Sequence, residues 1–208
     1  MELRHFAEGL GYLGSALGVA MVVPQIVRTY RNRTLPGVSA MSWALTAISC
    51  LTWLLYGVRT AEVPQIPGNV LLVSGAVVVV LAVPSARSVG YRATALLAAA
   101  SSVTVIAFLV PSSAIGGLGF AIGLVSGLPQ LLVSLSRRSG ESAVSLLTWG
   151  LRVACQASWL MYAILIGDMV VTVSAAFLGA CAALVLGAEL VRRPQPAPAP
   201  TPVLAPSR

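Results

Sequence analysis

The sequence contains an internal repeat, and this repeat constrains the fold more than any other feature of the chain. The pair Pro24-Gln25, near the end of an apolar run, recurs 105 residues later as Pro129-Gln130. A one-residue insertion raises the offset to 106, and Trp53-Leu54-Leu55-Tyr56 then recurs as Trp159-Leu160-Met161-Tyr162. Tryptophan and tyrosine are rare in this chain, so chance would not place them at matched positions. We therefore expect two copies of one structural unit.

Composition places most of the chain inside a membrane. Hydrophobic residues make up 57% of the 208 residues and charged residues only 9%, whereas a soluble domain carries roughly 25% charged residues. All 13 basic residues are arginines, and they lie between apolar runs rather than along one face. This distribution favours anchoring in a lipid bilayer over binding to nucleic acid.

The sequence offers no signal for a metal, a cofactor or catalysis. Its only histidine is His5, and Cys50, Cys155 and Cys181 lie within apolar runs without the spacing of metal ligands. We interpret the cysteines as small packing residues and expect neither a metal nor a cofactor. No nucleophile–base pair and no phosphate-binding loop can be identified, so we do not expect an enzyme.

Seven apolar runs are each long enough to cross a bilayer as a helix. They cover residues 9–27, 39–58, 66–83, 93–110, 114–135, 143–166 and 169–191, to within a few positions. Residues 1–8 lack the basic start of a signal peptide, so we expect the first run to be retained. Residues 192–208 are rich in proline and alanine, which predicts a disordered tail.

Arginines divide unequally between the two sides that seven crossings define. The side of the N-terminus holds Arg4 and Arg59, and Arg152 lies inside a helix. The remaining arginines all fall on the opposite side: Arg28, Arg31, Arg33, Arg87, Arg92, Arg137, Arg138, Arg192, Arg193 and Arg208. Because positively charged loops stay in the cytoplasm, we predict a plasma-membrane protein with its N-terminus outside and its C-terminus inside.

The number of helices per repeat fixes the relative orientation of the two repeats. Each repeat contains three helices, so a second copy joined directly to the first would be inverted. The extra helix predicted within 86–112 adds one crossing and restores the orientation. The sequence therefore predicts an all-α membrane protein of two parallel three-helix bundles, 9–85 and 113–191, joined by a linker helix.

The two Pro-Gln pairs lie inside predicted helices, where proline disturbs the backbone. Pro24 and Pro129 lack an N–H group and leave the carbonyls of Ala20 and Val125 without their helical donors. In lipid these carbonyls need other partners, which the amides of Gln25 and Gln130 can supply. We predict that the pairs act as hinges that let each bundle rock, the alternative being a static kink. Pro64-Gln65 matches neither position and is not counted as a third copy.

Two three-helix Pro-Gln repeats joined by a linker helix resemble the SWEET sugar transporters of the MtN3/PQ-loop superfamily, a known case of parallel repeats. The resemblance covers about residues 9–191. It implies facilitative uniport of a mono- or disaccharide across the bilayer by alternating access. The carboxylates Glu8, Glu62, Asp168 and Glu189 lie at helix ends rather than at the midplane, which favours uniport over coupling to protons.

The resemblance also implies that a tryptophan and an asparagine from each half bracket the sugar. The indoles of Trp53 and Trp159 can stack on the apolar face of a pyranose, the alternative being an interfacial aromatic belt. Asn69 is the asparagine of the first half, and an amide inside an apolar helix needs a partner. The second half has Ala175 there, beside Ser174, so the pattern is incomplete and the substrate stays open.

Three further residues are expected near the same cavity. Cys50 and Gln156 occupy matched positions in the two repeats. Arg152 lies inside a helix where the first repeat has Thr46, and a charge there is costly unless it faces a cavity or a partner. Arg152 can either extend to the cytoplasmic surface or bind a carboxylate or phosphate of the substrate.

The outer ends of the repeats carry a second group of polar residues. They are Tyr56, Arg59, Glu62, Tyr162 and Asp168. The resemblance implies an outer gate in which such residues close the cavity by pairing. The alternative is a solvated ion pair in a loop, worth at most about 1 kcal/mol.

Two other functions stay open at this stage. One is a PQ-loop transporter of amino acids or another small metabolite, which the missing second asparagine and Arg152 keep open. The other is a membrane receptor on the same fold that transports nothing, although the matched tryptophans and prolines suit alternating access better. Assembly into a homo-oligomer also stays open.

Overall fold

The computed structural model consists of seven α-helices and describes residues 2–31, 40–82, 87–136 and 145–191. The helices are α1 (Glu2–Arg31), α2 (Ala40–Thr60), α3 (Gln65–Ala82), α4 (Val89–Leu109), α5 (Ser112–Ser136), α6 (Leu146–Ile166) and α7 (Met169–Val191). Six of them are long and apolar enough to cross a membrane, and α5 contributes a shorter apolar segment, Ser112–Ser126. The predicted all-α membrane fold with seven helices is confirmed.

Two helices begin earlier than predicted. α1 already includes the charged residues before position 9, because Arg4 pairs with Glu8 one turn later, Nε to Oε1 at 3.0 Å, and stabilises the first turns. α4 begins before position 93 because Ser88 caps it: the Ser88 side chain accepts a hydrogen bond from the backbone N–H of Tyr91 at 3.2 Å. Hydrophobicity alone misses both starts, since neither segment is apolar.

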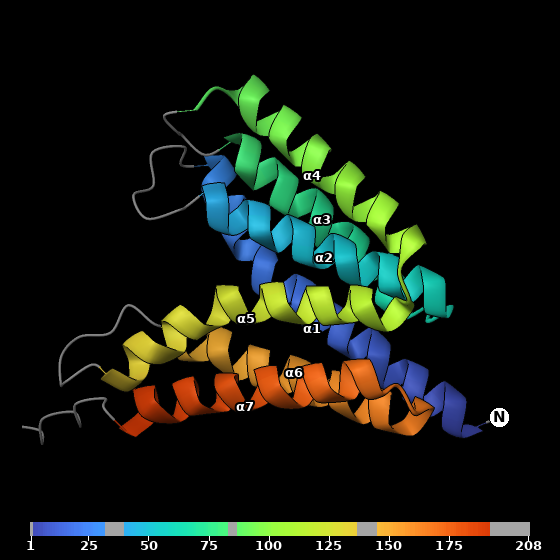
Figure 1. Ribbon diagram of the computed structural model, residues 1–208. Coiled ribbons are helices and arrows are strands. Elements are labelled where there is room, and N and C mark those ends of the chain that lie inside the picture. The colour runs from blue at the N-terminus through green and yellow to red at the C-terminus, as the bar shows by residue number, and fades with distance from the viewer. Residues whose placement is uncertain (1, 32–39, 83–86, 137–144, 192–208) are drawn as a thin grey trace, which may run out of the picture.

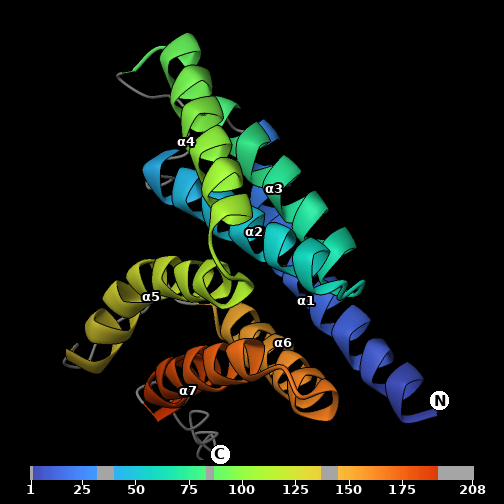
Figure 2. The same ribbon diagram turned by 45° about the vertical axis from the view of Figure 1, so that its right-hand side comes forward.

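The helices form two bundles that follow the repeats. In the first, α3 packs against both α1 and α2, and in the second, α7 packs against both α5 and α6. Between the bundles, α1 packs on α6 and α2 packs on α5, so the first helix of each repeat meets the second helix of the other. α4 lies along α2 and α3, on the outside of the first bundle (Figures 1 and 2). This arrangement is the predicted pair of parallel bundles with a linker helix.

The two bundles approach each other unequally at their two ends. They lie close together at the end where α1 begins, and their helices diverge toward the end where α7 finishes (Figure 1). We call the first end the N-terminal face. It carries the connections α2–α3, α4–α5 and α6–α7.

Both predicted hinges lie within continuous helices. α1 continues through Pro24 to Arg31, and α5 continues through Pro129 to Ser136. The side chains of Pro24, Gln25, Pro129 and Gln130 lie outside the described part of the structure, so the hinge stays a prediction. The loop arginines Arg33, Arg137 and Arg138 and the tail 192–208 also lie outside it.

Candidate functional site

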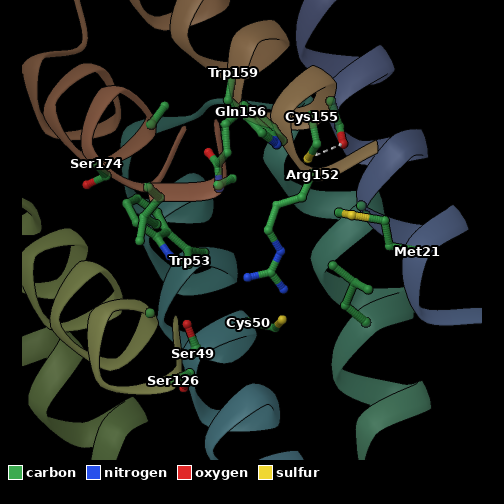
Figure 3. Close-up of a pocket in the computed structure, with 18 of the residues that line it drawn as sticks. Met21, Ser49, Cys50, Trp53, Ser126, Arg152, Cys155, Gln156, Trp159 and Ser174 are labelled. Carbon is green, nitrogen blue, oxygen red and sulfur yellow. Dashed lines mark hydrogen bonds between the residues drawn. The ribbon is translucent and has the colours of Figure 1, made fainter. Parts of the chain in front are cut away.

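A cavity of about 290 Å³ lies between the two bundles. Its walls come from α1, α2 and α3 of the first repeat and α5, α6 and α7 of the second. All residues that the sequence suggested for substrate binding line it: Trp53, Trp159, Asn69, Cys50, Gln156, Ser174 and Ala175. Arg152 and its repeat counterpart Thr46 line it as well (Figure 3). The structure thus brings together residues that are up to 129 positions apart in the chain.

The two tryptophans hold equivalent positions in the two repeats, and both line the cavity. Trp53 of α2 packs edge-on against Tyr56, with ring centroids 5.7 Å apart and an interplanar angle of 78°. Trp159 of α6 packs against Tyr162 in the same way, at 5.6 Å and 76°. Edge-to-face contacts of this kind stabilise aromatic pairs by about 0.5–1.5 kcal/mol. Each indole is therefore held by the tyrosine one turn further along its own helix.

Glycines on the facing helices make room for these indoles. A Cβ added to Gly119 of α5 would lie 2.9 Å from Nε1 of Trp53, and one added to Gly14 of α1 would lie 2.9 Å from Nε1 of Trp159. Both distances are shorter than a Cβ normally approaches, so a larger residue at either position would force the indole to shift. The two glycines belong to equivalent rows with one spacing: Gly11, Gly14 and Gly18, then Gly116, Gly119 and Gly123. Small residues in such rows let membrane helices approach closely.

Hydrogen bonds next to these glycines join the bundles in a matching pattern. Ser49 Oγ of α2 donates to the carbonyl of Gly119 at 3.4 Å. Cys155 Sγ of α6 donates to the carbonyl of Gly14 at 3.3 Å (Figure 3). Ser49 and Cys155 are repeat equivalents. Cys155 is thus a buried packing residue, as its sequence context suggested, and it also links two helices.

The amide groups of the first bundle line one side of the cavity. Asn69 Nδ2 donates to the backbone carbonyl of Gln65 at 2.7 Å, one turn earlier in α3. Gln65 itself is only 2% exposed, and its Nε2 has no hydrogen-bond partner among the described residues. A buried amide without a partner costs about 1–3 kcal/mol, and a ligand in the cavity can supply the missing acceptor. Repeat symmetry does not reveal Gln65, because its Pro-Gln pair does not follow the repeat.

Two pairs of side chains connect the bundles at the N-terminal face. Tyr56 Oη donates to both carboxylate oxygens of Asp168, at 2.8 and 2.9 Å. Tyr162 Oη donates to Glu62, and Nη2 of Arg4 pairs with the same carboxylate at 3.2 Å. The sequence suggested these four tyrosine and carboxylate residues as a gate, but not Arg4. Each pair takes its tyrosine from one repeat and its carboxylate from the other.

Arg59 has a different role from the one expected. It donates through Nη1 to the backbone carbonyls of Ala107 and Val110 at the end of α4. The last carbonyls of a helix have no intrahelical donors and carry partial negative charge, which attracts a guanidinium group. Arg59 therefore holds the linker helix, and the arginine that pairs with Glu62 is Arg4.

The guanidinium group of Arg152 points into the cavity (Figure 3). Its central carbon lies 5.1 Å from the ring centroid of Trp149, a cation–π contact. Among the described residues, no carboxylate pairs with it. Trp149 lines the cavity too, although its repeat counterpart Trp43 does not.

These features define a polytopic membrane protein in which two parallel three-helix bundles enclose a central cavity. Residues 6–66 match the family model described as a PQ loop repeat. A solved structure titled "The 3.7 A resolution structure of a eukaryotic SWEET transporter" shares the fold, with a TM-score of 0.78 and 12% sequence identity. The match covers 92% of this chain and 99% of the other. No curated protein sequence matches significantly. Residues 6–66 are thus similar to a PQ loop repeat, and the chain shares the fold of a SWEET transporter, as predicted.

Proposed function

We propose that the protein is a facilitative transporter of small sugars that works by alternating access. The observation that carries the proposal is the cavity between the bundles, which Trp53 and Trp159 line from equivalent positions of the two repeats. A pyranose presents apolar C–H faces to such indoles, while Asn69, Gln65 and Gln156 offer amides to its hydroxyl groups. The volume of about 290 Å³ lies near the lower end of small-molecule pockets, roughly 300–1,000 Å³. This size favours a monosaccharide over a disaccharide.

The lining of the cavity supports uniport. No aspartate, glutamate or histidine belongs to the described residues that line it. A carrier driven by protons needs a group that gains and loses a proton as the site changes sides, and the described walls offer none of these side chains. We therefore assign passive transport down the substrate gradient.

The proposed transporter has a defined orientation and defined moving parts. The arginine bias supports an orientation with the N-terminal face outside the plasma membrane and the C-terminus in the cytoplasm. Tyr56–Asp168 and Tyr162–Glu62 then form an outer gate that joins the bundles when the cavity faces inward. Pro24 and Pro129, near the other ends of α1 and α5, are the proposed hinges about which the bundles rock.

Uptake into proteoliposomes tests this function. Purified protein reconstituted at known density should equilibrate labelled glucose across the membrane faster than empty liposomes do. Uptake should saturate and should not depend on an imposed pH gradient. Uptake of amino acids without any sugar, or strict dependence on the pH gradient, would reject sugar uniport. Binding of a ligand without any transport would favour the receptor alternative.

The gate predicts that Tyr56→Phe opens the N-terminal face. The substitution removes a hydroxyl that donates to a carboxylate, and such hydrogen bonds contribute about 1.5–3 kcal/mol. The population with an open outer gate should therefore rise about tenfold or more. Cys50 lines the cavity and can report this change, because a membrane-impermeant maleimide added outside should modify it faster in Tyr56→Phe.

The labelling experiment has internal controls. Cys155→Ser and Cys181→Ala leave Cys50 as the one remaining thiol, and serine at 155 reproduces the residue of the other repeat. Tyr12→Phe changes an exposed tyrosine of α1 and should leave the labelling rate unchanged. An equal rate in Tyr56→Phe and in the parent protein would show that this pair does not close the cavity.

A further inference from the structure

Arg152 gives the central cavity a net positive charge that the described structure leaves unbalanced. The cavity is lined by one arginine and, among the described residues, by no acidic side chain. No described residue accepts a hydrogen bond from the guanidinium group of Arg152, which instead contacts the ring face of Trp149. A charge at this depth is costly unless it meets a counter-charge or water. A neutral sugar supplies no counter-charge.

The Arg152 side chain extends into the cavity rather than to the membrane surface. Arg152 lies two turns before Trp159 on α6, on the same side of the helix. Its guanidinium group projects into the open centre of the cavity (Figure 3), although the residue lies within a membrane-spanning helix. The first repeat has the neutral Thr46 at the equivalent wall position. The positive charge is therefore a feature of one repeat alone.

We propose that the site binds and transports hydroxylated monocarboxylates, that is, sugar acids. The carboxylate pairs with Arg152, and the ring lies against Trp53 and Trp159. The proposal rests on the transport function proposed above and names the substrate class of the same cavity. A guanidinium group offers two parallel donors that match a carboxylate, which gives both affinity and orientation.

The number of charges favours a carboxylate over a phosphate ester. A phosphate monoester carries about 1.5–2 negative charges at neutral pH. With one arginine and no second cation on the described walls, part of that charge would stay unbalanced in a site of low dielectric constant. A carboxylate carries a single charge, which Arg152 neutralises.

Transport of glucuronate and glucose by the reconstituted protein tests the proposal. Labelled glucuronate should enter faster than labelled glucose at equal low concentration, and unlabelled glucuronate should compete better than glucose 6-phosphate. Arg152→Gln should lower the kcat/KM of glucuronate about 10- to 100-fold, the effect of removing a hydrogen bond to a charged group. Glucose transport by Arg152→Gln should fall by a smaller factor than glucuronate transport, and an unchanged melting temperature of the purified variant shows that it is folded. Arg152→Lys should recover part of the glucuronate activity.

Arg87→Gln is the matched control. Arg87 makes a cation–π contact with Tyr91 at the same 5.1 Å, but it lies outside the cavity. Its substitution should leave the ratio of glucuronate to glucose transport unchanged.

In the parent protein, an inside-positive membrane potential should accumulate glucuronate and not glucose, because one negative charge then crosses with each sugar acid.

The outcomes separate the two proposals. Transport of glucose without any transport of glucuronate would overturn the sugar-acid assignment and leave sugar transport standing. Absence of transport for both compounds would overturn the proposed function as well. An equal loss of both activities in Arg152→Gln would show that Arg152 supports the fold rather than the substrate. If glucose 6-phosphate competed better than glucuronate, the preferred substrate would be a dianion, and the assignment to monocarboxylates would be overturned.

Discussion

Alanine at Trp53 or Trp159 is expected to reduce sugar uptake by at least about 30-fold in each case. Each indole forms one wall of the cavity, and truncation of a central tryptophan in a binding site typically costs about 2 kcal/mol or more. The substitution also leaves a void beside Tyr56 or Tyr162, which each indole contacts edge-on. Initial rates in proteoliposomes, normalised to the amount of inserted protein, measure the effect.

Trp43→Ala provides the comparison for the tryptophan variants. Trp43 belongs to the same helix as Trp53, but it does not line the cavity. Its loss should lower uptake far less than the loss of Trp53. Phenylalanine at position 53 should recover much of the rate, since a flat apolar face is kept. If Trp53→Ala transported as well as Trp43→Ala, the indoles would not be part of the substrate site.

Leucine at Gly119 is expected to abolish transport and to lower the melting temperature of the purified protein. A side chain at this position would collide with Thr52 and Trp53, whose nearest atoms lie 2.8 and 2.9 Å from the added Cβ. Either α2 and α5 separate or Trp53 turns away, and overpacking of this kind costs about 1–3 kcal/mol. Gly14→Leu should behave in the same way at α1 and α6, through Trp159.

The neighbouring Gly117 shows whether the effect comes from packing. It lies in the same helix, and a Cβ added there meets nothing within 4 Å. Gly117→Leu should keep its transport rate and its melting temperature, measured in the same detergent. If Gly117→Leu and Gly119→Leu were equally impaired, helix propensity or insertion would explain the result, and close contact between the bundles would not.

Much of the fold could be predicted because a membrane restricts the choices. The spacing of apolar runs gave seven helices, and three helices per repeat required a linker to make the repeats parallel. The start of α1 was missed because its stabilising pair, Arg4 and Glu8, lies outside the apolar pattern. Hydropathy detects the apolar part of a helix, whereas local ion pairs and caps decide where the helix begins.

The site was predictable to the extent that repeat symmetry could reveal it. Trp53 and Trp159 stand out because rare residues recur at one offset. The glycine rows obey the same symmetry and were detectable, but their meaning depends on which helices face each other. Gln65 and Arg152 break the symmetry. The second repeat has Val171 at the position equivalent to Gln65, and the first repeat has Thr46 at the position equivalent to Arg152. Comparing the repeats locates such residues but does not give their contacts.

Each carboxylate at the N-terminal face has a second partner within its own bundle. Glu62 accepts a hydrogen bond from Tyr162 of the other bundle and also pairs with Arg4 of its own. Asp168 accepts from Tyr56 of the other bundle and also from the backbone N–H of Val171 in α7, at 3.0 Å. In the proposed transporter both carboxylates therefore keep a partner after the tyrosines have moved away. The open outer gate then leaves neither charge without a contact.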